Sequence, residues 1–353
     1  MVNINTPSPA PRVLLKDVAQ RAHVSIMTVS RALRHGDRVS VKVRDRIRRL
    51  AARMGYRPDP HLSALVAYRN RRRPPSEQAV VAYLTSDRTR TGYQASTVSR
   101  DALLGASERG RELGYRVENI WLPDLTKRRR DPSRVLRARG IRGIILARLP
   151  DLRESVSLHW ADFSCVAVGY SMQPLLFHTV ASHLFHDMCL AFTHAVEHGY
   201  RRPALLLSKD LDQRTQHQLR GAFLYCQESL PAGDRLPIGW TSPIVQPGEL
   251  RSYLHTHRPD VLLSIGPLVE GALRQLGLHP PREVGLIDLC LEERTGPISG
   301  VFQDFQTIGR AAMDRLNILL QHGESGLPQK AAVTALYGEW ISGRTLRPLK
   351  PRR

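Results

Sequence analysis

The chain has 353 residues, of which 42% are hydrophobic, and its formal net charge is +20. This length exceeds one small domain and allows sizeable buried cores, and the excess of cations favours an anionic partner. The charge is concentrated, because residues 12–73 hold 17 Lys or Arg and only four Asp. A basic head on a nearly balanced body is typical of nucleic-acid binding rather than of a uniformly charged surface.

Cysteine use and the N-terminus indicate the compartment. The four cysteines, Cys165, Cys189, Cys226 and Cys290, lie far apart in the sequence without CxxC spacing. Each stands among apolar residues, so we expect buried free thiols in a reducing compartment. Residues 1–11 form a Pro-rich tail without the pattern of a signal peptide, and no stretch approaches about 18 consecutive apolar residues. We expect a cytoplasmic protein.

Residues 16–34 predict two short helices joined by a tight turn. Small apolar residues recur at helical spacing on both sides of Val24 and Ser25. Ser25 stands where an N-cap belongs. The shared apolar seam leaves an outward face on the second helix, formed by Ile26, Met27, Thr28, Ser30, Arg31 and Arg34. Such a face fits a DNA major groove.

A third helix is expected from Ser40, as its N-cap, to about Met54, with Gly55 ending it. It closes a three-helix core, and its other face is basic. Residues 59–75 then predict a short helix that begins at Asp59 and a Pro-bounded linker. So short a helix is marginal in isolation, and we expect it to be ordered on DNA.

From residue 78 onward, the sequence pattern is typical of an α/β fold. Buried strands are expected at 79–84, 116–121, 143–147, 165–170, 203–208, 260–265 and 283–289, and helices at 100–113, 132–139, 184–198, 214–228, 267–276 and 304–321. Apolar strands that alternate with helices imply parallel sheets covered on both faces. The number of units favours two lobes with a cleft between them.

Three segments, LKDVAQRAHVSIMTVSRAL, RVSVKVRDRI and MGYRPDP, resemble the LacI/GalR family of bacterial transcription regulators. The resemblance implies an α plus α/β fold: a helix-turn-helix DNA-binding domain at 12–58, a hinge at 59–75, and a two-lobed periplasmic-binding-protein-like body at 76–346. This body would dimerise and bind an effector, and residues 347–353 would be a tail.

The resemblance also implies site residues. DNA contacts would come from Leu15, Lys16, Ser25, Ile26, Met27, Thr28, Ser30, Arg31, Arg34 and Tyr56, with Leu65 of the hinge as a minor-groove wedge. His23 replaces the glycine that is usual in the turn, and Asp59 replaces an asparagine.

The cleft departs further from the family. Gln216 stands where sugar-binding members often have an arginine, and Ile265-Gly266 replaces an Asn-Asp pair, so an ordinary hexose effector is not expected. The remaining candidates for effector binding are Tyr93, Tyr170, Gln216, Asp288 and Gln303.

The sequence therefore predicts a nucleoid-associated, homodimeric DNA-binding regulator, a repressor on a pseudo-palindromic operator. A small molecule would modulate it, with a carbohydrate derivative as one candidate. We expect no enzyme activity, metal or cofactor. One alternative is a dimeric regulator without an effector, and another is an enzyme or solute-binding protein with a vestigial head. A third is a zinc hydrolase, because residues 194–198 read HAVEH, with His194 and His198 as ligands and Glu197 as base.

Overall fold

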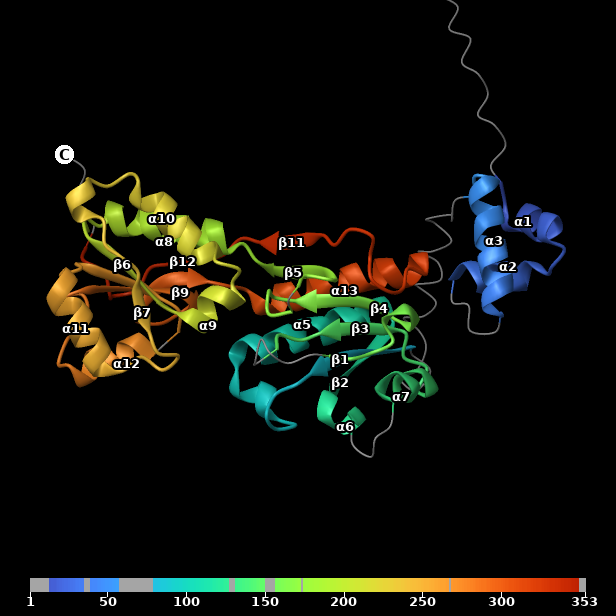
Figure 1. The fold of residues 1–353 in the computed structure, drawn as a ribbon, viewed down its shortest axis with the longest axis horizontal. Helices are drawn as coiled ribbons and strands as arrows, with labels where there is room; N and C mark the ends of the chain where they lie inside the picture. Colours follow the sequence, from blue (N-terminus) through green and yellow to red (C-terminus); the bar gives the residue numbers. More distant parts are fainter. Residues whose placement is uncertain are drawn as a thin grey trace, which may run out of the picture.

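A three-helix head and a two-lobed body make up the chain (Figure 1). The computed structural model describes residues 13–34, 39–56, 79–126, 131–149, 156–172, 174–266 and 268–348. The predicted hinge at 59–75, with Asp59 and Leu65, lies outside the described residues, as do most of both predicted tails.

The head contains α1 (Leu15–Ala22), α2 (Ile26–Arg34) and α3 (Val41–Arg53). Its core is formed by Val18, Ala19, Ala22, Val29, Ala32, Ile47 and Ala51, so the predicted three-helix arrangement is confirmed. Gly55 has a φ of 71° and follows the last turn of α3, a conformation that costs glycine little. Ser40 is the N-cap residue of α3, as predicted, but its side chain makes no capping hydrogen bond.

Lobe 1 is built on a parallel sheet with the strand order β11-β5-β4-β3-β1-β2. The strands are β1 (Ala79–Thr85), β2 (Tyr115–Trp121), β3 (Gly143–Leu146), β4 (Ser164–Val168), β5 (His178–Ser182) and β11 (Val333–Leu336). The helices are α5 (Thr97–Leu113), α6 (Leu122–Thr126), α7 (Pro132–Ala138) and α13 (Phe305–His322). Two apolar clusters, one on each face, bury the central strands, as their continuous apolar runs require.

Lobe 2 is built on a second sheet, with the strand order β12-β10-β9-β8-β6-β7. In this sheet β12 alone pairs antiparallel. The strands are β6 (Pro203–Ser208), β7 (Gly239–Thr241), β8 (Val261–Ser264), β9 (Gly285–Leu291), β10 (Ser299–Phe302) and β12 (Glu339–Ile341). The helices are α8 (Leu184–Glu197), α9 (Lys209–Arg214), α10 (Gln218–Gln227), α11 (Pro247–His257) and α12 (Leu268–Gln275). Short 3-10 turns occur at Gly92–Ala95, Trp160–Asp162 and Ala232–Asp234.

Three crossovers join the lobes. The chain passes from β5 to α8, from β10 to α13 and from β11 to β12. The two predicted lobes are confirmed, and the crossovers lie where a change in lobe angle must be absorbed.

Within lobe 1, α5 and α13 pack backbone to backbone. A Cβ at Gly105 of α5 would overlap the carbonyl oxygen of Gln306, and a Cβ at Gly309 of α13 would overlap that of Ala102. The two helices lie side by side in lobe 1 (Figure 1). Because neither position has room for a side chain, these glycines fix the distance between the helices.

Two sequence predictions for the body need correction. The helix expected at 214–228 begins only at Gln218, as α10, because α9 ends at Arg214 and Gln216 and His217 then adopt left-handed φ values of 53° and 60°. The cysteines are free, but only Cys165 is fully buried. Cys189 and Cys226, far apart in sequence, bring their Sγ atoms to 3.4 Å. In the described part of the chain, no helix is both long and apolar enough to cross a membrane.

Candidate nucleic-acid interface and interlobe cavity

Ser25 fixes the start of the candidate recognition helix α2. Its Oγ accepts a hydrogen bond of 3.1 Å from the Thr28 N–H and lies 2.9 Å from the Thr28 hydroxyl. An N-cap of this kind satisfies a backbone donor that the first helical turn leaves unpaired. Ser25 and Thr28 thus stabilise the helix end, whatever else they contact.

The outward face of α2 exposes two large apolar side chains. Ile26 is 53% and Met27 59% exposed, although both have the hydrophobic character of core residues. Lys16 is also exposed, and Ser30 is half-buried. Such apolar side chains without a partner suit thymine methyl groups in a major groove.

Other predicted DNA residues have structural contacts. Leu15 and Tyr56 are half-buried and pack against the head core. Arg31 and Arg34 lie on α2, but their side chains are outside what the structure describes, as is Leu65.

The turn between α1 and α2 has an unusual backbone. His23 ends α1 with φ 53° and ψ 47°, in the left-handed region. A residue with a Cβ is strained there, so glycine would fit this backbone with less strain than the histidine does. The turn retains its form in this chain because the N–H of Val24 also bonds to the carbonyl of Ala19, at 3.1 Å.

Two arginines of α3 make contacts that sequence reasoning missed. Arg46 donates a hydrogen bond of 3.0 Å to the carbonyl of Ala22, at the C-terminal end of α1. Arg48 donates one of 3.0 Å to the carbonyl of Gly323, at the C-terminal end of α13 in lobe 1. In both contacts a cation meets the negative end of a helix dipole, which is favourable. The basic face of α3 is therefore partly structural.

A cavity of about 100 Å³ lies between the lobes. By the same measure, one water molecule needs roughly 10–15 Å³, so a small molecule has room to enter. Its walls are largely apolar, with Val98, Val168, Ala181, Leu184, Leu211, Ile265, Phe305 and Ile308 contributed by both lobes. A largely apolar pocket with a few polar groups is typical of small-molecule sites.

Polar side chains of the cavity wall are mostly bonded to one another. The Tyr170 hydroxyl donates to the carbonyl of Ser182 at 3.1 Å, and Ser182 Oγ donates to Gln303 Oε1 at 2.7 Å. Gln303 Nε2 donates to the carbonyl of Leu289 at 2.9 Å. This chain of bonds spans the β5–α8 and β10–α13 crossovers, so it joins the lobes and leaves little free capacity for ligand hydroxyl groups.

The structure brings two of the five predicted effector residues, Tyr170 and Gln303, to this cavity. Tyr93 and Gln216 are half-buried and lie outside the cavity lining. Asp288 is buried, and its Oδ1 accepts hydrogen bonds from the N–H groups of Gly266 (3.0 Å) and Cys290 (2.9 Å). Burial raises the pKa of Asp288. Its contacts are those of a residue that shapes the strand end.

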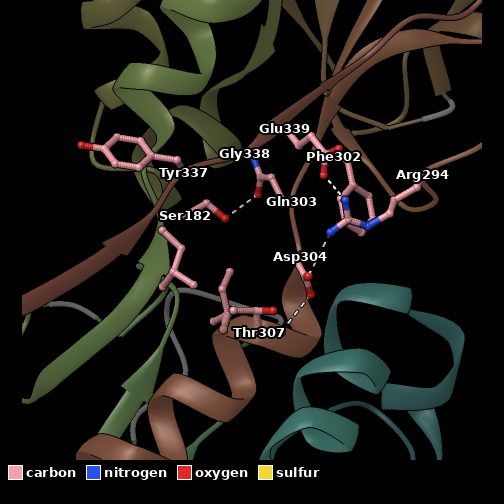
Figure 2. Close-up of a pocket in the computed structure, with 11 residues that line it drawn as sticks. Ser182, Arg294, Phe302, Gln303, Asp304, Thr307, Tyr337, Gly338 and Glu339 are labelled. Atoms are coloured by element: carbon pink, nitrogen blue, oxygen red, sulfur yellow. Dashed lines mark hydrogen bonds and ion pairs between the residues drawn. The ribbon is translucent and has the colours of Figure 1, made fainter.

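A second cavity, of about 180 Å³, lies beside the crossovers (Figure 2). Figure 2 shows the Arg294 guanidinium between Asp304, at 3.3 Å, and Glu339. Asp304 Oδ1 also accepts the Thr307 N–H at 2.8 Å and so caps α13. Because these acids stand at the β10–α13 and β11–β12 crossovers, Arg294 ties two crossovers together. These ion pairs compensate the charges of Arg294, Asp304 and Glu339 within the protein.

The HAVEH pattern does not assemble a metal site. The His194 ring stacks on Trp340 with centroids 4.1 Å apart, and His198 Nδ1 hydrogen-bonds the carbonyl of Arg347. Among the described residues, no group of three or more His, Cys, Asp or Glu could hold a metal ion. The zinc hydrolase alternative therefore gains no support.

Residues 14–59 match the family described as "Bacterial regulatory proteins, lacI family". The head of this chain is thus similar to that of the lacI family. The matched segment spans the capped α2, the His23 turn and α3. No curated protein sequence matches the chain.

Solved structures extend the likeness from the lacI-family head to the body. The "transcriptional regulator CelR-cellobiose complex" is 18% identical with a TM-score of 0.55, covering 95% of this chain and 100% of that one. The lac repressor dimer bound to operator and the anti-inducer ONPF is 17% identical with a TM-score of 0.56, covering 96% and 100%. A LacI family regulator from Enterococcus faecium with bound ribose is 13% identical with a TM-score of 0.57, covering 77% and 100%. At these identities the likeness shows the shared fold: a head followed by a two-lobed body.

Proposed function

We propose that this lacI-family chain is a sequence-specific DNA-binding transcription regulator, acting as a repressor at the nucleoid and not as an enzyme. The observation that carries the proposal is the capped, solvent-exposed α2 within a head that matches the family over residues 14–59. Its exposed Ile26 and Met27 have no structural role in the head core. The strong positive charge of residues 12–73 supplies attraction to phosphates.

The protein acts as a homodimer on a pseudo-palindrome. One recognition helix covers too few base pairs for specificity, and two-fold protein symmetry requires two-fold symmetry in the DNA. The solved lac repressor is described as a dimer bound to operator, which supports this arrangement here. Sedimentation of the full chain at micromolar concentration should give a dimer. A monomer that binds one half-site tightly would contradict the proposal.

The test of DNA binding uses the full chain. Selection from random duplexes should enrich a pseudo-palindrome, and the log of the binding constant should fall with the log of salt by about 0.9 per phosphate contacted. Arg31→Ala should lose roughly 1–3 kcal/mol on the selected site, whereas Arg116→Ala, on β2 of the body, should lose nothing. Failure to enrich any sequence, or equal binding by the Arg31 variant, would exclude sequence-specific recognition by α2.

An effector between the lobes regulates this binding. The cavity touches the crossovers, so a ligand that prefers one lobe angle shifts the whole body between conformations. Neighbouring folds are described with bound cellobiose and ribose, which supports a small, carbohydrate-derived molecule here. From the sequence, residues 59–75 with Leu65 as wedge would pass the change to DNA, and the coupling would be reciprocal.

A regulator without an effector is the second candidate. The internal hydrogen bonds of Tyr170, Ser182 and Gln303 favour it, since these three side chains already bond to protein groups and not to a ligand. The two candidates differ in one measurement: a cavity ligand that changes operator affinity supports the first, whereas an operator affinity that no cavity ligand alters supports the second.

A further inference from the structure

Two arginines from opposite lobes reach the cavity between the lobes. Arg148 follows β3 of lobe 1, and Arg214 ends α9 of lobe 2. Arg214 is 8% exposed. Its guanidinium donates to the carbonyl of Leu149 in lobe 1 and pairs with Asp210 at 3.3 Å. It therefore bridges the lobes from a fixed position.

Arg148 has no comparable partner. No hydrogen bond or ion pair joins its guanidinium to any other residue that the structure describes. It is largely buried, and burial lowers its pKa, with Arg214 as the next cause. Asp87 and Asp210 act in the opposite direction, but less strongly. Arg148 is thus a cation partly withdrawn from water that lines the same cavity as a second cation, Arg214.

The other polar groups cannot supply the missing negative charge. Burial raises the pKa of Cys290, the thiol on the cavity wall, to about 12, so it is neutral. Thr215 donates its hydroxyl to the carbonyl of Leu211 at 2.8 Å. Ser171 Oγ accepts the N–H of Leu149 at 2.8 Å. Among the described residues of this lining, the guanidinium of Arg148 is the charged donor group that has no bonded acceptor.

A buried charge is costly unless an opposite charge and hydrogen bonds compensate it. Guanidinium groups bind carboxylates and phosphates with paired hydrogen bonds. We propose that the effector is a small organic anion whose carboxylate or phosphate group lies between Arg148 and Arg214, with its remaining atoms against the apolar wall. This inference rests on the proposed function of the cavity as the effector site, and it adds the chemical class.

The same contact explains how the ligand would act. An anion held by both arginines links β3 of lobe 1 to α9 of lobe 2, beside the existing bond from Arg214 to Leu149. It therefore stabilises the closed arrangement of the lobes, while a neutral ligand leaves the charge of Arg148 uncompensated.

The test is thermal unfolding of the full-length protein at constant ionic strength with defined probes. These are sodium sulfate against sodium chloride, a set of carboxylates including a sugar acid, a set of phosphate monoesters including a sugar phosphate, and the matching neutral sugars and amides. Sulfate and at least one organic anion should raise the Tm. Carboxylates and phosphate esters should compete for one site. The class that raises the Tm more identifies the anionic group of the natural ligand.

Arg148→Met is the decisive variant, with Arg116→Met on β2 as the control, because Arg116 is half-exposed and outside the cavity. Without ligand, the Arg148 variant should have an equal or higher Tm, since it removes an uncompensated cation. It should bind the organic anion at least tenfold more weakly, and Arg148→Lys should recover part of that loss. The Arg116 variant should respond as the wild type does.

Three results would overturn the inference. The first is an equal Tm response of wild type and Arg148→Met to every anion, and the second is a larger Tm shift with a neutral sugar than with its acid. The third is a lower Tm of Arg148→Met without ligand together with unchanged anion binding. Operator binding is measured in parallel. If a neutral ligand changes operator affinity, the proposed function stands and the anionic class fails. If no DNA is bound specifically, the proposed function fails whatever the cavity holds.

Discussion

Arg48 of the head donates a hydrogen bond of 3.0 Å to the main-chain carbonyl of Gly323, directly after α13. At the other end of this helix, Phe305 and Ile308 line the interlobe cavity. An 18-residue helix is about 27 Å long and moves as a unit. One rigid element therefore touches both the cavity and the head.

Replacing Arg48 should loosen the head. Arg48→Met removes a charged donor from the C-terminal end of α13, and we expect a loss of about 1 kcal/mol in head docking. Amide exchange near residues 319–324 should become faster without DNA. Arg49→Met is the matched control, because Arg49 donates to the carbonyl of Asp45 in its own helix. Equal exchange in both variants would show that the head does not dock through Arg48.

The turn at His23 should tolerate glycine better than histidine. His23→Gly relieves the left-handed backbone at φ 53°, which costs a residue with a Cβ roughly 1–2 kcal/mol, but it also makes the unfolded chain more flexible. We expect the opening free energy of α1 and α2 to rise by up to about 1 kcal/mol, so their amide exchange should become slower. His23→Ala keeps the Cβ and should show no gain. A gain in both variants would point to the imidazole rather than the backbone.

The crossing of α5 and α13 should not accept a methyl group. Gly309→Ala places a Cβ against the carbonyl oxygen of Ala102, and we expect a loss of about 3 kcal/mol or more in unfolding free energy. Gly271→Ala in α12 has open space around the new Cβ and should stabilise that helix by up to about 1 kcal/mol. Denaturant unfolding of the two variants should therefore shift in opposite directions. A neutral Gly309→Ala would mean that the helices separate easily.

Stability should fall below neutral pH in part through His178. Its Nδ1 accepts the Ala332 N–H at 3.1 Å, and the Arg315 guanidinium lies 3.1 Å from Nε2. Burial, and then Arg315, lower the pKa of His178, while Glu324 raises it. The unfolded chain therefore binds this proton more tightly, so stability is complete above the ordinary pKa of about 6.5 and declines as pH falls below it.

The His178 contribution is measured as a difference between proteins. His178→Gln should reduce the slope of unfolding free energy against pH between about 6.5 and 5.5, by at most about 1.4 kcal/mol per pH unit. His255→Gln, at an exposed position of α11, controls for the loss of one histidine. If His178→Gln keeps the wild-type slope, other groups control the acid response.

Much of the head was predictable because local signals agree there. The apolar period in α1 and α2, Ser25 as cap and Gly55 as C-terminal glycine each depend on near neighbours. Ser40 shows the limit of such signals, since the same residue type precedes α3 without bonding to it. The contact of Arg48 with Gly323 joins residues 275 positions apart, and no local pattern contains it.

The cavity was predicted less well, and for a physical reason. Tyr170 and Gln303 come from segments next to crossovers, which the two-lobed fold brings to the cleft. Gln216 was assigned by its place in a motif, but the left-handed turn after α9 separates it from the lining. Arg148 directly follows a buried strand, and in parallel sheets ligands bind beyond the carboxyl ends of the strands. The position of Arg148 in the sequence could therefore have indicated a residue of the ligand site. Arg214 offered none, because its helix end was not predicted.

Lobe 1 is not continuous in the chain, and this affects its synthesis. Its sheet receives β5 before lobe 2 begins, but α13 comes about 120 residues later and β11 follows only after α13. At ordinary translation rates this gap lasts on the order of 6–25 s. During that time the α5 surface around Gly105 and the free edge of β5 have no partner from their own chain. Lobe 2 can fold almost completely first, so a nascent chain halted before residue 305 should expose lobe 1 to chaperones and proteases.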